Sequence, residues 1–120
     1  MVAYRLFRQT KGRTFFAEVA VGREADISAE LGKAPEEWVT AAREGVATAS
    51  ATLGSQGSTD IKLCDVKGTW VDTTHDVVYV AAIMAVMRFL GREEQLEPVY
   101  ADGKWVVRER IRPDAGQSGR

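Results

Sequence analysis

The first part of the chain shows the alternation of apolar and polar positions that is typical of paired strands. Val2 to Phe7 alternates loosely and contains several large apolar side chains, and Phe15 to Val21 has a similar β-rich character. The residues between these runs, Gln9 to Arg13, are polar and include Gly12. Two strand-like runs joined by a short glycine-containing segment predict a β-hairpin.

The periodicity then changes to that of a helix. Gly22 to Ala34 is polar and irregular and is interpreted as a loop. Pro35 suits the first turn of a helix, and Gly54 is a typical residue to follow a helix that ends at Leu53. Apolar residues recur between these limits at helical spacing and form a single stripe: Trp38, Ala42, Val46, Ala49 and Leu53.

A third strand and a second helix follow. Ser55 to Ser58 is interpreted as a loop, and Asp60 to Val71 mixes apolar with polar positions as a strand does. Thr73 or Thr74 is placed to cap the next helix. That helix is predicted over Val77 to Leu90, and because it is apolar on nearly every face it should be the more buried of the two.

A second hairpin is predicted near the end of the chain. Leu96 to Tyr100 and Lys104 to Ile111 are strand-like, and Asp102-Gly103 between them favours a two-residue turn. The element order is therefore ββαβαββ. The simplest packing is an α+β fold with both helices on one face of a mainly antiparallel sheet. The path from the second strand through the first helix to the third strand is a candidate βαβ crossover.

Composition indicates one ordinary globular domain. The chain has 120 residues, of which 45% are hydrophobic and 28% are charged. We expect a single domain over residues 1–112 and a disordered tail from Pro113 to Arg120, which is rich in Gly, Ser and Gln. The net charge of −1 excludes a globally basic nucleic-acid binder, so any such contact has to come from local clustering of Lys and Arg.

Several features point to the cytoplasm. Met1 to Arg5 has no apolar signal-peptide core, and the longest apolar stretch, Val77 to Met87, is shorter than the roughly 20 residues that cross a bilayer. Cys64 is the only cysteine, so the chain cannot form an internal disulfide, which suits a reducing compartment. With one His and one Cys, neither a metal site nor a cofactor is expected.

The predicted first turn is the clearest candidate for a binding site. It gathers Arg8, Lys11 and Arg13 around Gly12, which places three cations on one exposed tip. Lys and Arg side chains supply most protein contacts to nucleic-acid phosphates. The alternative is a solvated hairpin tip without a ligand.

Four stretches occur in the order, and nearly at the spacing, of motifs in a known family. They are Arg8-Gln9-Thr10-Lys11-Gly12-Arg13 with Phe16-Ala17-Glu18-Val19, then Ala42-Arg43-Glu44-Gly45-Val46, then Val71-Asp72-Thr73-Thr74 with Ala81-Ala82, and Leu96-Glu97-Pro98. Together they resemble domain IV of bacterial elongation factor G. The resemblance covers most of the chain, from about Tyr4 to Pro98.

This resemblance implies a fold, a partner and a site. The fold would be that of the ribosomal protein S5 domain 2-like superfamily, with an unusual left-handed βαβ unit. The partner would be RNA of the small ribosomal subunit, contacted in translation by two loops at the tip of the domain. The RNA-binding residues would be Arg8, Gln9, Thr10, Lys11, Gly12 and Arg13 on the first loop and Lys67, Gly68, Thr69 and Trp70 on the second.

The chain departs from the family pattern in ways that exclude the activity of the whole factor. It contains no Gly-x-x-x-x-Gly-Lys-(Ser/Thr) motif, so it cannot hydrolyse GTP or drive translocation alone. The second loop is about one residue shorter, and the histidine at the family's tip has no counterpart, since His75 aligns with the start of a helix. We therefore expect a free-standing, non-catalytic RNA-binding module.

Two other function classes remain open at this stage. In one, the chain keeps the scaffold without RNA binding and acts as a protein-interaction or structural module, with self-association through the hairpin from Leu96 to Ile111. A small enzyme is the third class, and it would need His75 to have carboxylate partners such as Asp72 or Asp76. Trp70 could either stack on an unpaired base or fold back onto the core.

Overall fold

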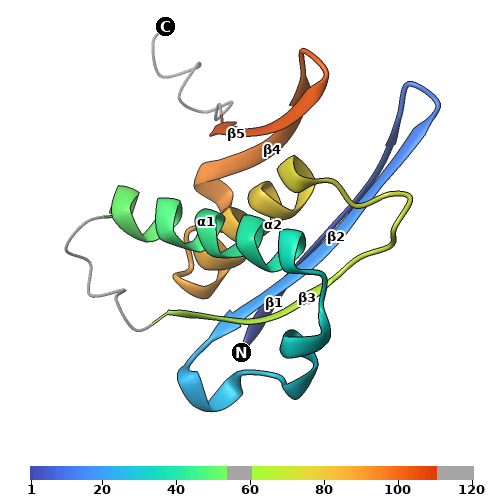
Figure 1. Cartoon of the computed structure of the whole chain (residues 1–120). Helices are drawn as coiled ribbons and strands as arrows, with labels where there is room; N and C mark the ends of the chain where they lie inside the picture. The colour runs from blue at the N-terminus through green and yellow to red at the C-terminus, as the bar shows by residue number, and fades with distance from the viewer. Residues whose placement is uncertain (54–60, 111–120) are drawn as a thin grey trace, which may run out of the picture.

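A computed structural model describes residues 1–53 and 61–110 (Figure 1). The strands and helices are β1 (Val2–Thr10), β2 (Arg13–Gly22), α1 (Glu36–Leu53), β3 (Lys62–Lys67), α2 (His75–Phe89), β4 (Leu96–Ala101) and β5 (Lys104–Glu109). Three short 3₁₀ turns are η1 (Glu24–Asp26), η2 (Ala29–Lys33) and η4 (Glu93–Gln95). The predicted order ββαβαββ and the α+β class are confirmed. The predicted loop Ser55–Ser58, the first residue of the predicted third strand (Asp60), the end of the last strand at Ile111 and the tail Pro113–Arg120 lie outside the described residues.

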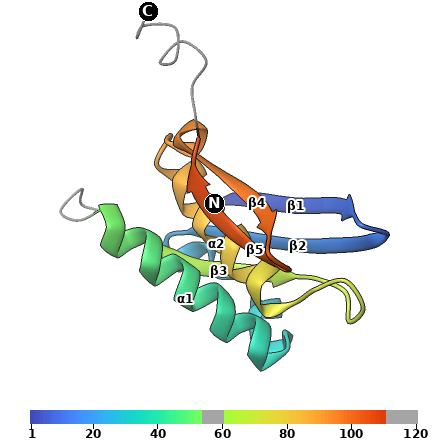
Figure 2. The same cartoon turned by 90° about the horizontal axis from the view of Figure 1, so that it is seen from above.

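The strands form two antiparallel sheets. β1, β2 and β3 are neighbours in a three-stranded sheet, and β4 pairs only with β5. The helices lie on one face of the larger sheet, as predicted (Figure 2). The two-sheet division was not predicted, because strand patterns give no information on which hairpins join.

The expected βαβ crossover is wrong, because β2 and β3 pair antiparallel whereas such a crossover joins parallel strands. The reason lies in residues 23–35, which we interpreted as an irregular loop. They form η1 and η2 and lead the chain back along the sheet before α1 begins (Figure 1). A bond from the Ser28 N–H to the Cys64 carbonyl, at 2.9 Å, holds this return segment beside β3.

Both hairpins close through two-residue turns in left-handed backbone. Lys11 and Gly12 have φ of 52° and 73°, and Asp102 and Gly103 have φ of 53° and 81°. Positive φ at both central residues is the conformation whose twist matches that of the flanking strands. The first turn is tighter than predicted because pairing between β1 and β2 continues to Thr10 and Arg13.

The core forms around α2, which is confirmed as the more buried helix. Between Val77 and Met87 every residue except Tyr79 is buried. α2 contacts β1 and β2 beneath it and lies between α1 and the β4–β5 hairpin (Figure 2). Phe15 of β2 packs against Tyr100 and Trp105, with ring centroids 5.0 and 5.6 Å away, and so joins the hairpin to the larger sheet.

The C-terminal end of α2 is tied to β1 through one arginine. The Arg88 guanidinium donates to the Ala3 carbonyl at 2.7 Å and to both carboxylate oxygens of Glu93 at 2.7 Å. The hydrogen bond from Arg88 lowers the pKa of the Glu93 carboxyl. The guanidinium also lies 5.0 Å from the ring centre of Tyr4, whose hydroxyl pKa is raised by burial.

Neither helix of the described chain combines the length and the apolar character that a membrane span requires.

The contact between the helices yields a first prediction. A Cβ added at Gly45 would lie 2.5 Å from the Tyr79 carbonyl oxygen and 2.7 Å from the Ala82 Cβ. Gly45→Ala therefore forces the helices apart, an overpacking cost of about 1–3 kcal/mol, against a gain in helix propensity of about 1 kcal/mol. We expect urea unfolding to show a net loss of stability. Gly32→Ala is the control, because its Cβ would meet nothing within 4 Å; equal stability of the two variants would contradict the prediction.

The Arg88–Glu93 pair yields a second prediction. Because the folded-state pKa of Glu93 is lowered, the pair stabilises the fold above the ordinary glutamate pKa of about 4.3 and this contribution is lost as the pH falls below it. Glu93→Gln should unfold at a lower urea concentration than the wild type at pH 7, and the difference should shrink at pH 3. The neighbouring exposed Glu94→Gln serves as the control, and a difference independent of pH would count against the pair.

Candidate nucleic-acid interface

The two predicted tip loops lie at the same end of the three-stranded sheet. The β1–β2 turn projects beyond the rest of the protein, and the segment from Gly68 to Thr73, which follows β3, passes beside the same hairpin (Figures 1 and 2). This arrangement follows from the antiparallel pairing of β2 with β3, because Lys67 at the end of β3 pairs with Glu18 in the middle of β2 and the chain then continues toward the β1–β2 turn. The structure thus brings together segments that are more than fifty residues apart in the sequence.

Hydrogen bonds fix the second segment to β2. The Phe16 N–H donates to the Asp72 carbonyl at 3.1 Å, and the Thr73 hydroxyl donates to the Phe16 carbonyl at 2.6 Å. The same hydroxyl accepts from the Thr69 N–H at 2.8 Å. Gly68 is required beside it, since a Cβ there would lie 2.3 Å from the Thr73 hydroxyl oxygen. Gly68 and Thr69 therefore shape the segment.

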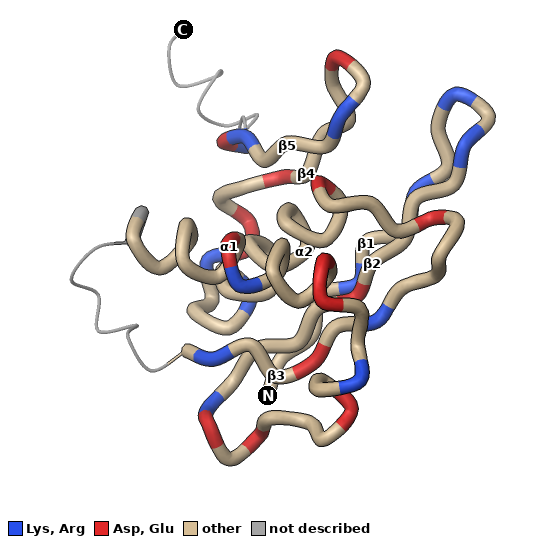
Figure 3. Tube along the Cα trace, in the orientation of Figure 1, with Lys and Arg blue, Asp and Glu red and all other residues tan. Residues whose placement is uncertain are grey.

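The β1–β2 turn carries exposed positive charge. Arg8, Lys11 and Arg13 are all exposed, and within the described residues none of the three forms an ion pair (Figure 3). The Arg13 guanidinium lies 4.8 Å from the centre of the Phe15 ring, which orients it without neutralising it. Among the described residues, the Arg8 guanidinium donates to the neighbouring Phe7 carbonyl, at 3.2 Å. These three charges are thus free to meet an anion.

The remaining residues of the first loop shape the hairpin. The Gln9 side-chain amide reaches the Thr14 hydroxyl at 3.5 Å, and Thr10 pairs with Arg13 where the strands end. Gly12 supplies one of the two left-handed positions of the turn. Gln9, Thr10 and Gly12 therefore support the turn.

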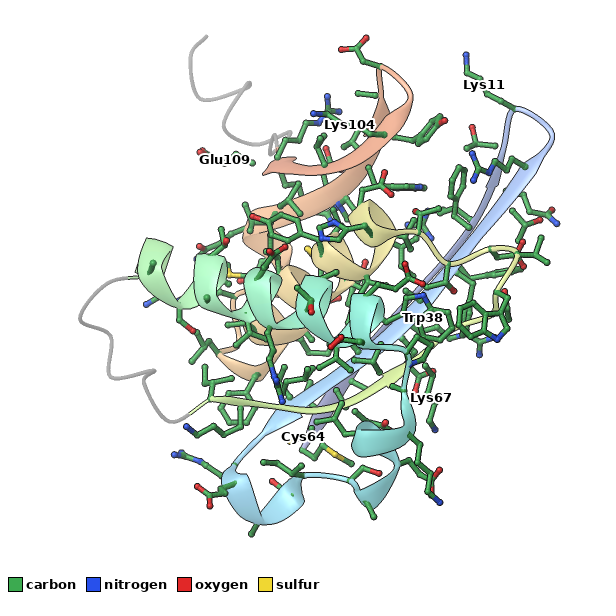
Figure 4. The ribbon with its side chains drawn as sticks, viewed as in Figure 1. Lys11, Trp38, Cys64, Lys67, Lys104 and Glu109 are labelled. Atoms are coloured by element: carbon green, nitrogen blue, oxygen red, sulfur yellow. The ribbon has the colours of Figure 1, made fainter. Side chains whose placement is uncertain are left out.

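Lys67, at the end of β3, and Trp70, in the second segment, lie in different chemical environments. Lys67 is exposed and lies opposite Glu18 of β2 in the sheet register. Trp70 is 75% exposed, and its ring packs against that of Trp38, with centroids 5.3 Å apart. Trp38 is labelled in Figure 4. It borders a shallow hollow of about 600 Å³. The lining residues are Pro35, Glu36, Glu37, Thr40, Trp70 and His75.

The acidic lining of this hollow bears on the predicted role of Trp70. Glu36 and Glu37 repel phosphate, so the surroundings of Trp70 suit a polyanion less well than those of Lys67 do. The sequence left two alternatives for Trp70, an exposed ring or a ring folded onto the core, and the structure has features of both. The ring packs against buried Trp38, while most of the Trp70 surface stays in solvent.

His75 occupies an exposed first-turn position of α2, as its sequence context predicts. Its Nε2 lies 3.1 Å from Glu44 Oε1 on α1. Asp76 instead accepts hydrogen bonds from the Thr74 hydroxyl, the Val77 N–H and the Trp105 N–H, the last at 2.7 Å. Thr74 is the N-cap residue of α2, but its side chain does not bond to the helix backbone. Among the described residues, His75 is thus paired with Glu44 and not with Asp76.

Other candidate chemistry is sparse in the part of the chain that the structure describes. No group of three or more His, Cys, Asp or Glu residues is placed to hold a metal ion there. The Cys64 thiol is buried, and this burial raises its pKa, so it is a poor nucleophile.

The chain matches no known protein-family model, and no curated protein is significantly similar to it.

Sequence reasoning missed two residues that shape this region. Thr73 was considered only as a helix cap, yet its hydroxyl joins β2 to the second segment. Phe7 is predicted to lie in a strand, but the prediction does not say to which side of the sheet it points. Tyr4 and Leu6 are buried, and the alternation of side chains along a strand indicates that Phe7 points to the other side. No local signal could have found the role of Thr73, because its partner Phe16 is far away in the sequence.

The attachment of the second segment leads to a third prediction. Thr73→Val keeps the shape of the side chain but removes both hydrogen bonds of the hydroxyl, at a cost of about 1–3 kcal/mol. Amide exchange at Thr69 should accelerate strongly while exchange within β1 changes little. Thr40→Val is the control, because Thr40 is exposed on α1. Protection of Thr69 in both variants would show that the hydroxyl does not hold the segment.

Proposed function

We propose that the chain is a non-catalytic RNA-binding module that contacts phosphates through its β1–β2 turn. The observation that carries this proposal is the group of three exposed cations, Arg8, Lys11 and Arg13, which form no ion pair among the described residues and lie on a turn that projects from the protein. Phosphate contacts of this kind provide affinity without chemistry. Lys67 lies farther from the turn, opposite Glu18 of β2, and is a weaker candidate for a phosphate contact.

The resemblance to domain IV of elongation factor G supports a ribosomal partner. In that reading the two loops meet structured RNA of the small subunit in the cytoplasm, and the chain acts in translation without a GTPase of its own. The placement of both loops at one end of the sheet is the geometry that this role needs, since a single RNA surface can then reach both. The antiparallel β2–β3 pairing differs from the crossover that the resemblance implies, so the RNA assignment rests on the charges of the turn.

A protein-interaction module is the alternative, and the exposed Trp70 favours it. A large aromatic ring beside Glu36 and Glu37 suits a basic peptide side chain. Self-association through β4–β5 belongs to the same alternative, because the hairpin forms a sheet of its own. Light scattering on the full chain distinguishes self-association from a monomer that binds RNA.

The fourth prediction tests the RNA proposal. The variant Arg8→Gln/Lys11→Asn/Arg13→Gln removes three charges, and Asn-Gly is the preferred sequence for this turn type. Filter binding to a labelled RNA stem-loop should weaken at least tenfold. The slope of log affinity against log salt should fall by roughly two to three, since each phosphate contact contributes about 0.7–0.9 to it.

A matched variant controls for total charge. Lys33→Gln/Arg43→Gln/Lys62→Gln removes the same charge from exposed positions away from the turn, so it should bind nearly as the wild type does. If the two variants lose affinity equally, or if neither loses any, the turn is not an RNA contact.

A further inference from the structure

Trp70 and Val71 form an exposed apolar patch on the segment between β3 and α2. Trp70 is 75% exposed and Val71 is 83% exposed. Hydrogen bonds close the turn that carries them, because the Thr73 N–H donates to the Thr69 carbonyl at 3.0 Å and the Asp72 N–H donates to the Thr69 hydroxyl at 3.1 Å. A partner that contacts these two side chains therefore meets an already ordered backbone, which lowers the entropic cost of binding.

Trp38 of α1 supports the Trp70 ring from the protein side. The two ring centroids are 5.3 Å apart and the ring planes are inclined by 41°. Trp38 is buried and belongs to the core, so α1 sets the position of the exposed ring. Pro35 and Thr40 border the shallow hollow of about 600 Å³ beside Trp70. The hollow thus has aromatic and aliphatic walls that face solvent.

The charged groups around this hollow are mainly acidic. Glu36 and Glu37 line it, both are exposed, and neither forms an ion pair within residues 1–53 and 61–110. The lining contains no Lys or Arg. His75, which also lines it, has its Nε2 3.1 Å from Glu44 Oε1, so a third carboxylate is close. The beginning of α1 contributes only about half a positive charge through its dipole, so the hollow keeps a net negative charge.

A Lys or Arg side chain has the two properties that match this surface. Its aliphatic stem packs on apolar atoms while its charged head remains beside carboxylates and water. A cation also gains energy over the face of an aromatic ring, and Trp is the most favourable ring for this contact. A ligand that carries phosphate is disfavoured by Glu36 and Glu37. A wholly apolar ligand would remove water from both carboxylates without replacing its hydrogen bonds.

We propose that the Trp70 hollow is a docking site for a basic segment of a partner protein, with one cationic side chain held between the Trp70 ring and the carboxylates of Glu36 and Glu37. This inference goes beyond the RNA contact of the β1–β2 turn and does not depend on it. It gives the protein-interaction alternative a defined site. Arg should be preferred to Lys, because its planar guanidinium stacks on aromatic rings and donates two parallel hydrogen bonds to a carboxylate.

The test measures fluorescence anisotropy of labelled peptides in which Ser alternates with Arg, Lys or Glu, titrated with the full chain. The Arg peptide should bind most tightly, the Lys peptide less tightly and the Glu peptide not at all. Trp70→Leu should weaken binding of the Arg peptide by about 2- to 30-fold, the range of one cation–π contact. Trp70→Phe should retain part of the affinity. Glu36→Gln/Glu37→Gln should weaken binding by about 2- to 5-fold for each lost charge pair.

Two controls separate the site from charge and from folding. Glu94→Gln/Glu109→Gln removes the same charge from exposed positions on η4 and β5, so it should bind the Arg peptide as the wild type does. Amide exchange at Thr69 should be the same in Trp70→Leu as in the wild type, which shows that the turn is intact. The triple variant of the β1–β2 turn should bind the Arg peptide no less tightly than the wild type.

The outcomes keep this inference distinct from the RNA proposal. If the Arg peptide does not bind, or if Trp70→Leu leaves its affinity unchanged, the docking site is wrong and the RNA proposal is unaffected. If Trp70→Leu weakens binding of the RNA stem-loop but not of the peptide, Trp70 is an RNA contact and the docking site is again wrong. If light scattering shows a wild-type dimer that Trp70→Leu converts to a monomer, a second copy of this chain occupies the hollow and the proposal of a separate partner fails.

Discussion

The structure depends on keeping α2 away from water on all sides. Between Val77 and Met87 the helix offers almost no polar side chain, so it has to be covered by three different partners. The sheet covers one side, α1 a second and the β4–β5 hairpin a third. Gly45 lets α1 approach closely enough to complete this shell. Since both helices and the second hairpin are used on the same side, the opposite face of the sheet is left open.

Two polar side chains at the beginning of α2 connect this core to the proposed binding end. Asp76 accepts from the Trp105 N–H and so positions β5, and Thr73 bonds to Phe16 and positions the second segment. Both residues lie within two positions of Thr74, at the point where the chain leaves solvent and enters the core. The Trp105 Nε1, which is buried and has no hydrogen-bond partner among the described residues, adds a cost that the packing around its ring has to offset. The geometry of the binding end is therefore a consequence of how α2 begins.

What could be read from the sequence was local. The hairpin turns, the order of elements and the burial of α2 all follow from patterns within single segments, and the structure agrees with each. The cations of the β1–β2 turn were identifiable for the same reason. The direction of β3 was not, because it depends on residues 23–35 returning along the sheet through η1 and η2. The acidic surroundings of Trp70 depend on α1 lying beside the second segment, and no spacing in the sequence contains that contact.

The net charge of −1 conceals an uneven distribution of charged side chains over the surface. Cations gather on the projecting β1–β2 turn, whereas Glu36 and Glu37 lie at the beginning of α1 (Figure 3). At physiological ionic strength a charge acts over about 8 Å, so an approaching polyanion interacts first with the part that projects furthest. A near-neutral protein can therefore present a local cationic surface, while Glu36 and Glu37 repel a polyanion from the hollow beside Trp70.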